Sequence, residues 1–312
     1  MSDKSEGKTG RQAPGFVDPA DWLGEKIAQV GTFLGKAFAE NISATDKIKE
    51  FSELVGRPVN PDDDERIDLV DPEFARAEFQ KLWPADLYFR PEISGCENIP
   101  ETGGAVLVSN HVTLAIDTMM LSKVIFDETG RLIRPTVDKF TIQFPYFREW
   151  VMRMGCVLGS RDNALRMAES GELVLSYPGG AREALKPGKD AYKLMWQGAT
   201  GFVKVAIKTG VPIIPIASVG GDEAFATLAE DNVLARKFMN SVKYTAPLFA
   251  GLGPLPLPVK FYFAVGAPIV HDLKPHHAED DQAVAELHAR AREELENLVD
   301  ETRVRRGPSA FG

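Results

Sequence analysis

The sequence is short of cysteine, of long apolar runs and of positive charge. Its 312 residues include two cysteines, Cys96 and Cys156, too few for a disulfide framework, so we expect a reducing compartment. Prolines and glycines interrupt the most apolar region, 244–270, and no stretch approaches the roughly 18 apolar residues of a bilayer-spanning helix. There are 36 Lys and Arg against 45 Asp and Glu. We therefore expect no transmembrane helix and no nucleic-acid partner.

The amino-terminal region divides into a tail and a helical segment. Residues 1–15 lack both periodicity and the apolar core of a secretory signal, which predicts a disordered tail. A helical segment follows over 16–86. Between 22 and 38 its apolar residues recur every three or four positions, which predicts an amphipathic helix. That apolar face either packs on the rest of the protein or lies on a bilayer, and the pattern leaves both open.

Short apolar runs alternate with helical patterns over 87–270. The predicted strands are 88–94, 105–109, 133–137, 172–177, 212–218 and 260–265, and the predicted helices are 116–126, 147–154, 163–169 and 198–209. A further short helix is predicted at 72–82, before this region. This alternation predicts an α/β fold with a mixed, largely parallel central sheet flanked by helices. Residues 271–312 hold a last helix, 281–305, and a tail. Two prolines, Pro212 and Pro215, favour an edge strand or a wall of the site over a central strand at 212–218.

A histidine and an aspartate follow the predicted strand 105–109. His111 stands directly after that strand, where open α/β sheets place their sites, and Asp117 comes six residues later. On one continuous helix their side chains would point about 120° apart. They meet only if His111 lies in a loop and Asp117 in the first helical turn. The carboxylate would then fix one ring nitrogen and leave the other free to take a proton. The alternative is a core histidine beside an unrelated helix-start aspartate.

Other residues suit a polar or anionic ligand. Adjacent glycines after a strand allow a ligand to approach the backbone closely, and arginines bind carboxylate or phosphate oxygens. The stretch 131–208 holds 13 Lys and Arg against 7 Asp and Glu, although the whole chain has a net charge of −9. Such a locally basic region favours an anionic small substrate or lipid head group. The alternatives are a tight turn with a surface ion pair, and a solvated helix start. The residues concerned are Arg161, Gly179, Gly180, Arg182 and Glu183.

Four motifs in order resemble those of the glycerolipid acyltransferase superfamily, over roughly 87–270. They are Asn110-His111 with Asp117, Gly155 to Arg161, Tyr177 to Arg182, and Val211 to Pro215. The chain has one residue more between His111 and Asp117 than the commonest phospholipid-making members, and Gly179 where they carry glutamate. Both differences are similar to the monoacylglycerol/diacylglycerol acyltransferase-like branch. The acceptors implied are lysophospholipids or neutral mono- and diacylglycerols.

The resemblance implies transfer of a fatty acyl group from acyl-CoA, or from acyl carrier protein, to a glycerolipid hydroxyl in lipid and phospholipid biosynthesis. His111 is then the general base and Asp117 its orienting partner, with no covalent intermediate, no metal and no cofactor besides the co-substrate. Backbone N–H groups at Gly179 and Gly180 would face the oxyanion. The residues expected to bind substrate are Asn110, Arg161, Gly179, Gly180, Arg182 and Glu183.

The same resemblance implies a cytoplasmic protein that associates peripherally with a membrane. Two segments are candidates for docking on it, the helix at 22–38 and the proline-rich stretch 248–259.

Two other functions use the same residues. A lipid esterase or thioesterase would use His111 and Asp117 to activate water, although the chain has no Gly-x-Ser-x-Gly elbow. A lipid-binding protein would keep the fold without turnover. Cys156 as a nucleophile and 276–281 as a metal site are weaker alternatives, because the first lacks a neighbour that would lower a thiol pKa and the second lacks ligand spacing.

Overall fold

A seven-stranded sheet is the centre of the structure, a computed structural model that describes residues 67–138, 145–229, 248–252 and 255–311. All of these belong to one compact unit, 57–312. The strand order is β1-β9-β6-β2-β5-β3-β4. The strands from β6 to β4 are mutually parallel, whereas β9 and β1 run the other way. The strands are β1 (Glu92–Ser94), β2 (Ala105–Ser109), β3 (Ile133–Val137), β4 (Val157–Leu158), β5 (Leu173–Ser176), β6 (Ile213–Val219) and β9 (Tyr262–Val265).

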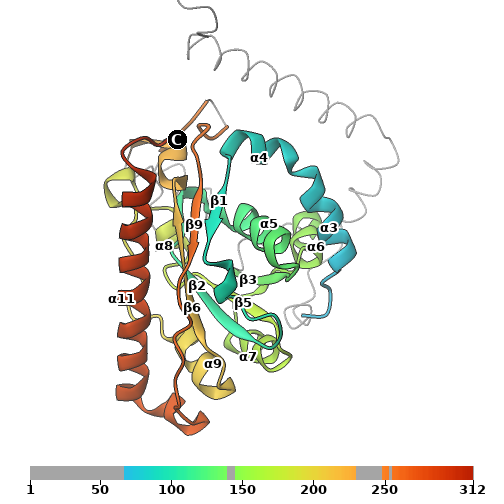
Figure 1. Cartoon of the computed structure of the whole chain (residues 1–312), viewed down its shortest axis with the longest axis vertical. Coiled ribbons are helices and arrows are strands. Elements are labelled where there is room, and N and C mark those ends of the chain that lie inside the picture. The colour runs from blue at the N-terminus through green and yellow to red at the C-terminus, as the bar shows by residue number, and fades with distance from the viewer. Residues whose placement is uncertain (1–66, 139–144, 230–247, 253–254, 312) are drawn as a thin grey trace, which may run out of the picture. The chain divides into compact units, whose positions relative to one another are not determined.

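Helices cover both faces of this sheet. Helix α5 (Asp117–Thr129) lies on one side, and α9 (Gly201–Thr209) and α11 (Asp281–Arg306) lie on the other (Figure 1). The predicted α/β fold with a mixed, largely parallel sheet is confirmed. Within the described residues, the other α-helices are α3 (Pro72–Lys81), α4 (Trp83–Phe89), α6 (Pro145–Arg153), α7 (Arg161–Glu169) and α8 (Ala181–Ala184). Strands β7 (Ala226–Ala229) and β8 (Leu248–Ala250) form a separate two-stranded sheet.

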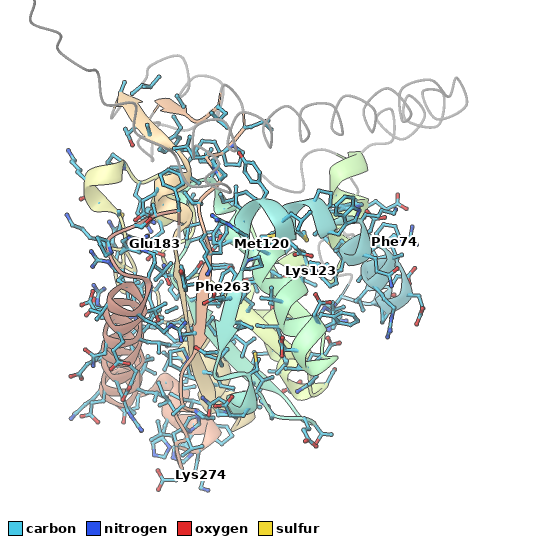
Figure 2. The ribbon with its side chains drawn as sticks, turned by 45° about the horizontal axis from the view of Figure 1, so that its top comes forward. Phe74, Met120, Lys123, Glu183, Phe263 and Lys274 are labelled. Carbon is cyan, nitrogen blue, oxygen red and sulfur yellow. The ribbon has the colours of Figure 1, made fainter. Side chains whose placement is uncertain are left out.

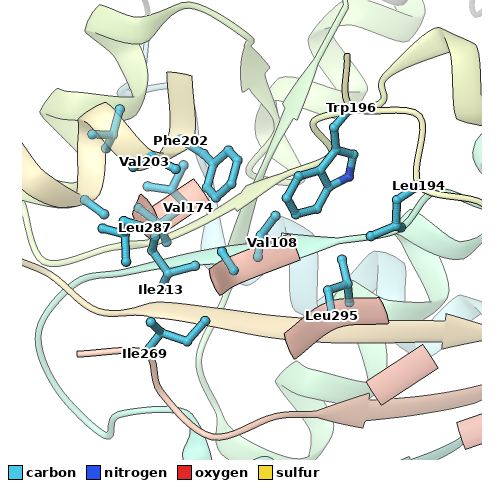
Figure 3. Close-up of a cluster of buried hydrophobic side chains, with 14 of the residues drawn as sticks. Val108, Val174, Leu194, Trp196, Phe202, Val203, Ile213, Ile269, Leu287 and Leu295 are labelled. Carbon is cyan, nitrogen blue, oxygen red and sulfur yellow. The ribbon is translucent and has the colours of Figure 1, made fainter. Parts of the chain in front are cut away.

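The central strand β2 shows why the sheet forms here. All of its residues are buried between β5 and β6, as expected for a parallel strand that is covered on both faces. Alternate side chains point to opposite faces, so Val106 and Val108 join the core beneath α9 and α11, whereas Leu107 joins the core beneath α5. The first core contains Trp196 and Phe202, whose rings meet edge to face at 5.3 Å (Figure 3).

The prediction of an edge strand at the two prolines is wrong, because β6 lies inside the sheet between β2 and β9. On its β9 side, the N–H of Ile213 donates to the carbonyl of Ile269, and the carbonyl of Pro215 accepts from Gly266 (2.8 Å). The nitrogen of Pro215 therefore faces the segment that begins at Gly266, after the last residue of β9. The proline removes no ladder bond from the pairing with β2, so an interior strand tolerates it.

The strand predicted at 88–94 begins later than expected. Residues 88 and 89 end α4, and Arg90 (φ 43°) stops that helix in the left-handed region, so β1 covers only 92–94. The predicted helix at 22–38 and part of 248–259 lie outside the described residues. Within the described ranges, no helix has both the length and the apolar character needed to cross a bilayer.

Candidate active site

His111 and Asp117 meet at the carboxyl edge of the sheet. β2 ends at Ser109, His111 lies in the loop that follows, and Asp117 is the first residue of α5. This is the arrangement that the sequence spacing requires for contact. His111 Nδ1 is 3.0 Å from Asp117 Oδ1, and Asp117 is fully buried. With a carboxylate as partner, Nδ1 carries the proton of the neutral imidazole, which leaves Nε2 as the proton acceptor.

The loop between these two residues is strained. Leu114 and Ala115 both have φ near +58°, in the left-handed region that residues with a side chain rarely adopt. Each such residue costs about 1–2 kcal/mol. The left-handed turn brings Asp117 back to the His111 ring, so a strained conformation sets the geometry of the pair. Such strain persists only where neighbouring groups hold the backbone in place.

Tyr177 provides a platform for the histidine. Its ring stacks on the imidazole of His111, with centroids 3.8 Å apart and planes 16° from parallel. Burial, together with nearby Asp117, raises the pKa of the Tyr177 phenol well above its ordinary value, so the ring stays neutral. The sequence motif contains this tyrosine, but no sequence pattern predicts the stacking.

Glu183 joins the third motif to the histidine loop. Its side chain, labelled in Figure 2, is fully buried. Oε2 accepts the backbone N–H of His111 (2.8 Å), and Oε1 accepts that of Met195 (2.7 Å). Burial raises the pKa of this carboxyl group. A Cβ added at Gly179 would lie 2.2 Å from Glu183 Oε1, so the glycine makes room for this carboxylate.

Asn110 anchors the other side of the loop. Its side-chain amide donates to the carbonyl of Ser218 and accepts from the N–H of the same residue, both at 2.8 Å. These bonds tie the end of β2 to β6. Asn110 and Glu183 are expected from sequence to contact substrate, and that contact stays a prediction. The partners that the structure gives them are backbone groups.

The second glycine of the third motif forms a tight turn. Gly180 has φ +52° and ψ −136°, a conformation open to glycine, and its N–H donates to the carbonyl of Tyr177 (2.9 Å). The contact expected between the Gly180 N–H and an oxyanion stays a prediction.

A cavity of about 410 Å³ adjoins the histidine through Tyr177. It lies on the α9 side of the sheet. Its rim includes Arg161, the exposed first residue of α7, together with Gly180. Arg182, on α8, is not among the lining residues. The cavity combines an apolar floor with a polar rim. The floor is formed by Val106, Ala164, Val174, Phe202 and Val205. The rim also includes Thr136, Asp138, Ser160 and Ser176.

The structure also bears on the two weaker alternatives, Cys156 as a nucleophile and 276–281 as a metal site. Burial raises the pKa of the Cys156 thiol to about 12, which keeps it protonated and a poor nucleophile. His276 and His277 lie on the short helix at Pro275–Glu279. Across the ranges that the structure describes, no cluster of three or more His, Cys, Asp or Glu side chains has the geometry of a metal site.

Comparisons with known proteins agree with the motifs. Residues 90–219 match the family model "Acyltransferase". A Mycobacterium leprae protein described as uncharacterized is 35% identical over 228 residues, which cover 71% of this chain and 61% of that protein. The human "DGAT1/2-independent enzyme synthesizing storage lipids" is 33% identical over 202 residues, covering 64% and 60%. "Phytyl ester synthase 1, chloroplastic" of Arabidopsis thaliana is 25% identical over 235 residues, covering 66% and 33%.

The matched family region contains all four motifs, from Asn110 to Pro215. The chain spans about three fifths of the length of the first two relatives. Residues 90–219 therefore form an acyltransferase domain.

Proposed function

We propose that the protein transfers a fatty acyl group from acyl-CoA, or another acyl thioester, to a lipid hydroxyl. The observation that carries this proposal is the 3.0 Å contact between His111 Nδ1 and the buried Asp117 carboxylate. A histidine held in this way is a general base whose protonated form the carboxylate stabilises. The match of residues 90–219 to the acyltransferase family supports acyl transfer as the reaction that uses this base.

The proposed reaction needs no covalent enzyme intermediate. The acceptor hydroxyl gives its proton to His111 Nε2 while its oxygen attacks the thioester carbonyl carbon. The tetrahedral intermediate then loses the thiolate as the C–S bond breaks, and the imidazolium returns the proton to the departing sulfur. Asp117 stabilises the imidazolium between these two steps.

The cavity beside Tyr177 is the proposed site for part of a lipid substrate. Its volume of about 410 Å³ lies within the range of ordinary ligand pockets. Its apolar floor suits an acyl chain, and Arg161 at the rim suits a phosphate or carbonyl oxygen. Arg182 and the glycines of the third motif are proposed to contact the same substrates from α8 and the turn before it.

A neutral acceptor is favoured over lysophosphatidate. The names of two relatives concern storage lipids and phytyl esters, both of which are neutral lipids. The chain also carries Gly179 where the commonest phospholipid-making members carry glutamate. We therefore propose mono- or diacylglycerol, or a long-chain alcohol, as the acceptor, with lysophospholipids as the comparison.

The decisive experiment is an acyl-transfer assay with separated lipid products. Purified protein receives radiolabelled acyl-CoA and, in turn, each neutral acceptor, each lysophospholipid or no acceptor. His111→Ala is expected to lower transfer by roughly 10²–10⁴-fold, whereas His276→Ala, on the distant helix Pro275–Glu279, is expected to leave it unchanged. Normal transfer by folded His111→Ala would overturn the mechanism. Free fatty acid as the only product would favour the esterase or thioesterase, and binding without any product would favour a lipid-binding protein.

Membrane association is the second part of the proposal. Three exposed leucines lie on segments at the carboxyl edge of the parallel strands, where His111 lies: Leu114 (41% exposed), Leu228 (64%) and Leu255 (38%). An apolar surface at the edge of the site would let a lipid pass from a bilayer to the histidine. Leu257, in the proline-rich stretch, instead packs against the core beneath α5.

Vesicle co-sedimentation tests the membrane surface. Leu228→Glu with Leu255→Glu is expected to reduce binding to phosphatidylcholine vesicles without changing the melting temperature. Val270→Glu is the matched control, because this exposed residue follows β9 at the opposite edge of the sheet. Unchanged binding by a stably folded double variant would reject this surface.

A further inference from the structure

A buried ion pair lies directly behind the histidine loop. Lys186 Nζ is 2.9 Å from Asp222 Oδ1, and both side chains are about 1% exposed. Lys186 follows α8, four residues after the end of the third motif, and Asp222 lies in the turn at Gly221–Ala224 that follows β6. No motif above predicts either residue, although a charged residue two or three positions after a buried strand is an available signal for Asp222.

Each member of the pair also bonds to the histidine loop. Lys186 Nζ donates to the carbonyl of His111 at 2.5 Å, and also to that of Glu183 at 3.3 Å. Asp222 Oδ1 accepts the backbone N–H of Thr113 at 2.9 Å and its hydroxyl at 3.2 Å. Asp222 Oδ2 accepts the N–H of Tyr192 at 2.8 Å. The pair therefore holds the backbone on both sides of Val112.

These hydrogen bonds hold the backbone directly before the two strained residues of the loop. Leu114 and Ala115, immediately after Thr113, have the left-handed conformation that brings Asp117 to the imidazole. A strained turn keeps its shape only while its neighbours hold it. The carbonyl of His111 and the N–H of Thr113 are the groups that Lys186 and Asp222 hold. Neither charge reaches solvent or the cavity beside Tyr177, so contact with substrate does not account for them.

We propose that Lys186 and Asp222 are positioning residues that keep the strained loop in the shape that pairs His111 with Asp117. The inference rests on the proposed role of His111 as general base. Loss of the pair would let the loop relax, and the imidazole would lose its carboxylate partner while the substrate cavity stayed intact. The defect should therefore appear in turnover rather than in substrate binding.

The test uses the full-length enzyme in the acyl-transfer assay. Lys186→Met and Lys186→Met with Asp222→Asn are compared with wild type, and the double variant avoids leaving an unpaired buried carboxylate. We expect kcat to fall at least tenfold in both variants, with KM for both substrates within twofold. Arg134→Met is the matched control. Arg134 is a buried cation that pairs with Glu172, and Glu172 directly precedes β5, at the edge of the sheet opposite this loop. This variant should lower the melting temperature and leave kcat unchanged.

The split between kcat and KM separates positioning from a merely structural role. A structural role would lower the melting temperature and leave kcat of the folded enzyme unchanged. A lower melting temperature with unchanged kcat would therefore overturn the inference.

Thr113 gives a milder version of the same test if the lysine variants do not fold. Thr113→Val removes the hydroxyl bond to Asp222 and should lower kcat without changing KM, whereas Thr113→Ser keeps that bond and should retain wild-type kcat. Normal kcat in Thr113→Val would then reject the inference. His111→Ala separates the two proposals: an active His111→Ala removes the basis of both, whereas an inactive one with normal Lys186 and Thr113 variants removes only the positioning role.

Discussion

The sheet has an apolar side and a polar edge that are built in opposite ways. Beneath α9 and α11, buried apolar side chains such as Trp196 and Phe202 fill the space. At the carboxyl edge, Lys186, Asp222 and Glu183 are just as deeply buried but carry polar or charged groups. The first region holds the fold together through the removal of apolar surface from water. The second fixes directions, because hydrogen bonds and ion pairs specify where each atom lies.

The polar edge contributes position rather than stability. Taking two charges out of water opposes folding, and a buried ion pair often offers no net gain over apolar residues of similar size. Lys186 and Asp222 compensate by engaging the His111 carbonyl and the Thr113 N–H. The comparison teaches that changes at the apolar side should act on the free energy of unfolding, whereas changes at the polar edge should act on turnover.

The largest effect on turnover is expected from Asp117→Asn. An amide cannot stabilise the imidazolium and favours the wrong tautomer of His111, so kcat should fall by about 10⁴-fold, as in serine-protease triads. Asp127→Asn, on the exposed surface of the same helix, is the control and should change kcat little. The measurement is steady-state acyl transfer beside a melting curve. An Asp117→Asn enzyme with a tenth or more of wild-type kcat would contradict the pairing.

The largest effect on stability is expected from Trp196→Ala on the apolar side. Trp196 is fully buried and meets Phe202 and His288 edge to face, so removing the ring should lower the free energy of unfolding by about 3–5 kcal/mol. Urea denaturation measures this loss. Trp83→Ala, at an exposed tryptophan, should change the free energy of unfolding far less. A specific loss of kcat in the folded fraction of Trp196→Ala would break the division between the two regions.

A smaller effect on catalysis is expected from Arg161 at the cavity rim. Loss of one charge-assisted contact costs about 1.5–3 kcal/mol, so Arg161→Gln should lower kcat/KM roughly 10–150-fold, with an unchanged melting temperature. Arg161→Lys should be intermediate, because lysine lacks the planar fork. Arg166→Gln, an exposed arginine on the same helix, is the control. Equal kinetics for the Arg161 and Arg166 variants would exclude the rim from the substrate site.

The smallest effect is a pH dependence of stability on the apolar side. Burial lowers the pKa of His288 below its ordinary value of 6.5, so the unfolded chain takes up the proton first as pH falls. The stability contributed by neutral His288 is complete above pH 6.5 and is lost as pH falls from there through the lower folded pKa. His288→Phe should therefore lessen the drop in melting temperature between pH 7.5 and 5.5. An unchanged drop would contradict this assignment.

Local patterns were enough to predict much of the candidate site. The spacing of His111 and Asp117 predicts contact only if a strand ends before the histidine and a helix begins at the aspartate, and the structure has both. The end of a strand and the start of a helix can be predicted from apolar runs and from the polar and turn-forming residues between them. The same patterns are wrong about Pro215, since whether a strand is interior depends on its neighbours. They also give no sign that the N–H of Gly180 donates to the carbonyl of Tyr177 within a tight turn.

Some determinants of this site are properties of the sequence and others exist only in the fold. Strand β2, the helix starts and the four motifs follow from residues close together in the chain, because hydrophobic periodicity and turn chemistry act locally. The bonds from Lys186 to His111 and from Thr113 to Asp222 join residues 75 and 109 positions apart. Sequence order alone gives no sign of such contacts. The sheet order brings the ends of β2, β5 and β6 to one edge, and that tertiary arrangement alone decides which charges are buried around the histidine.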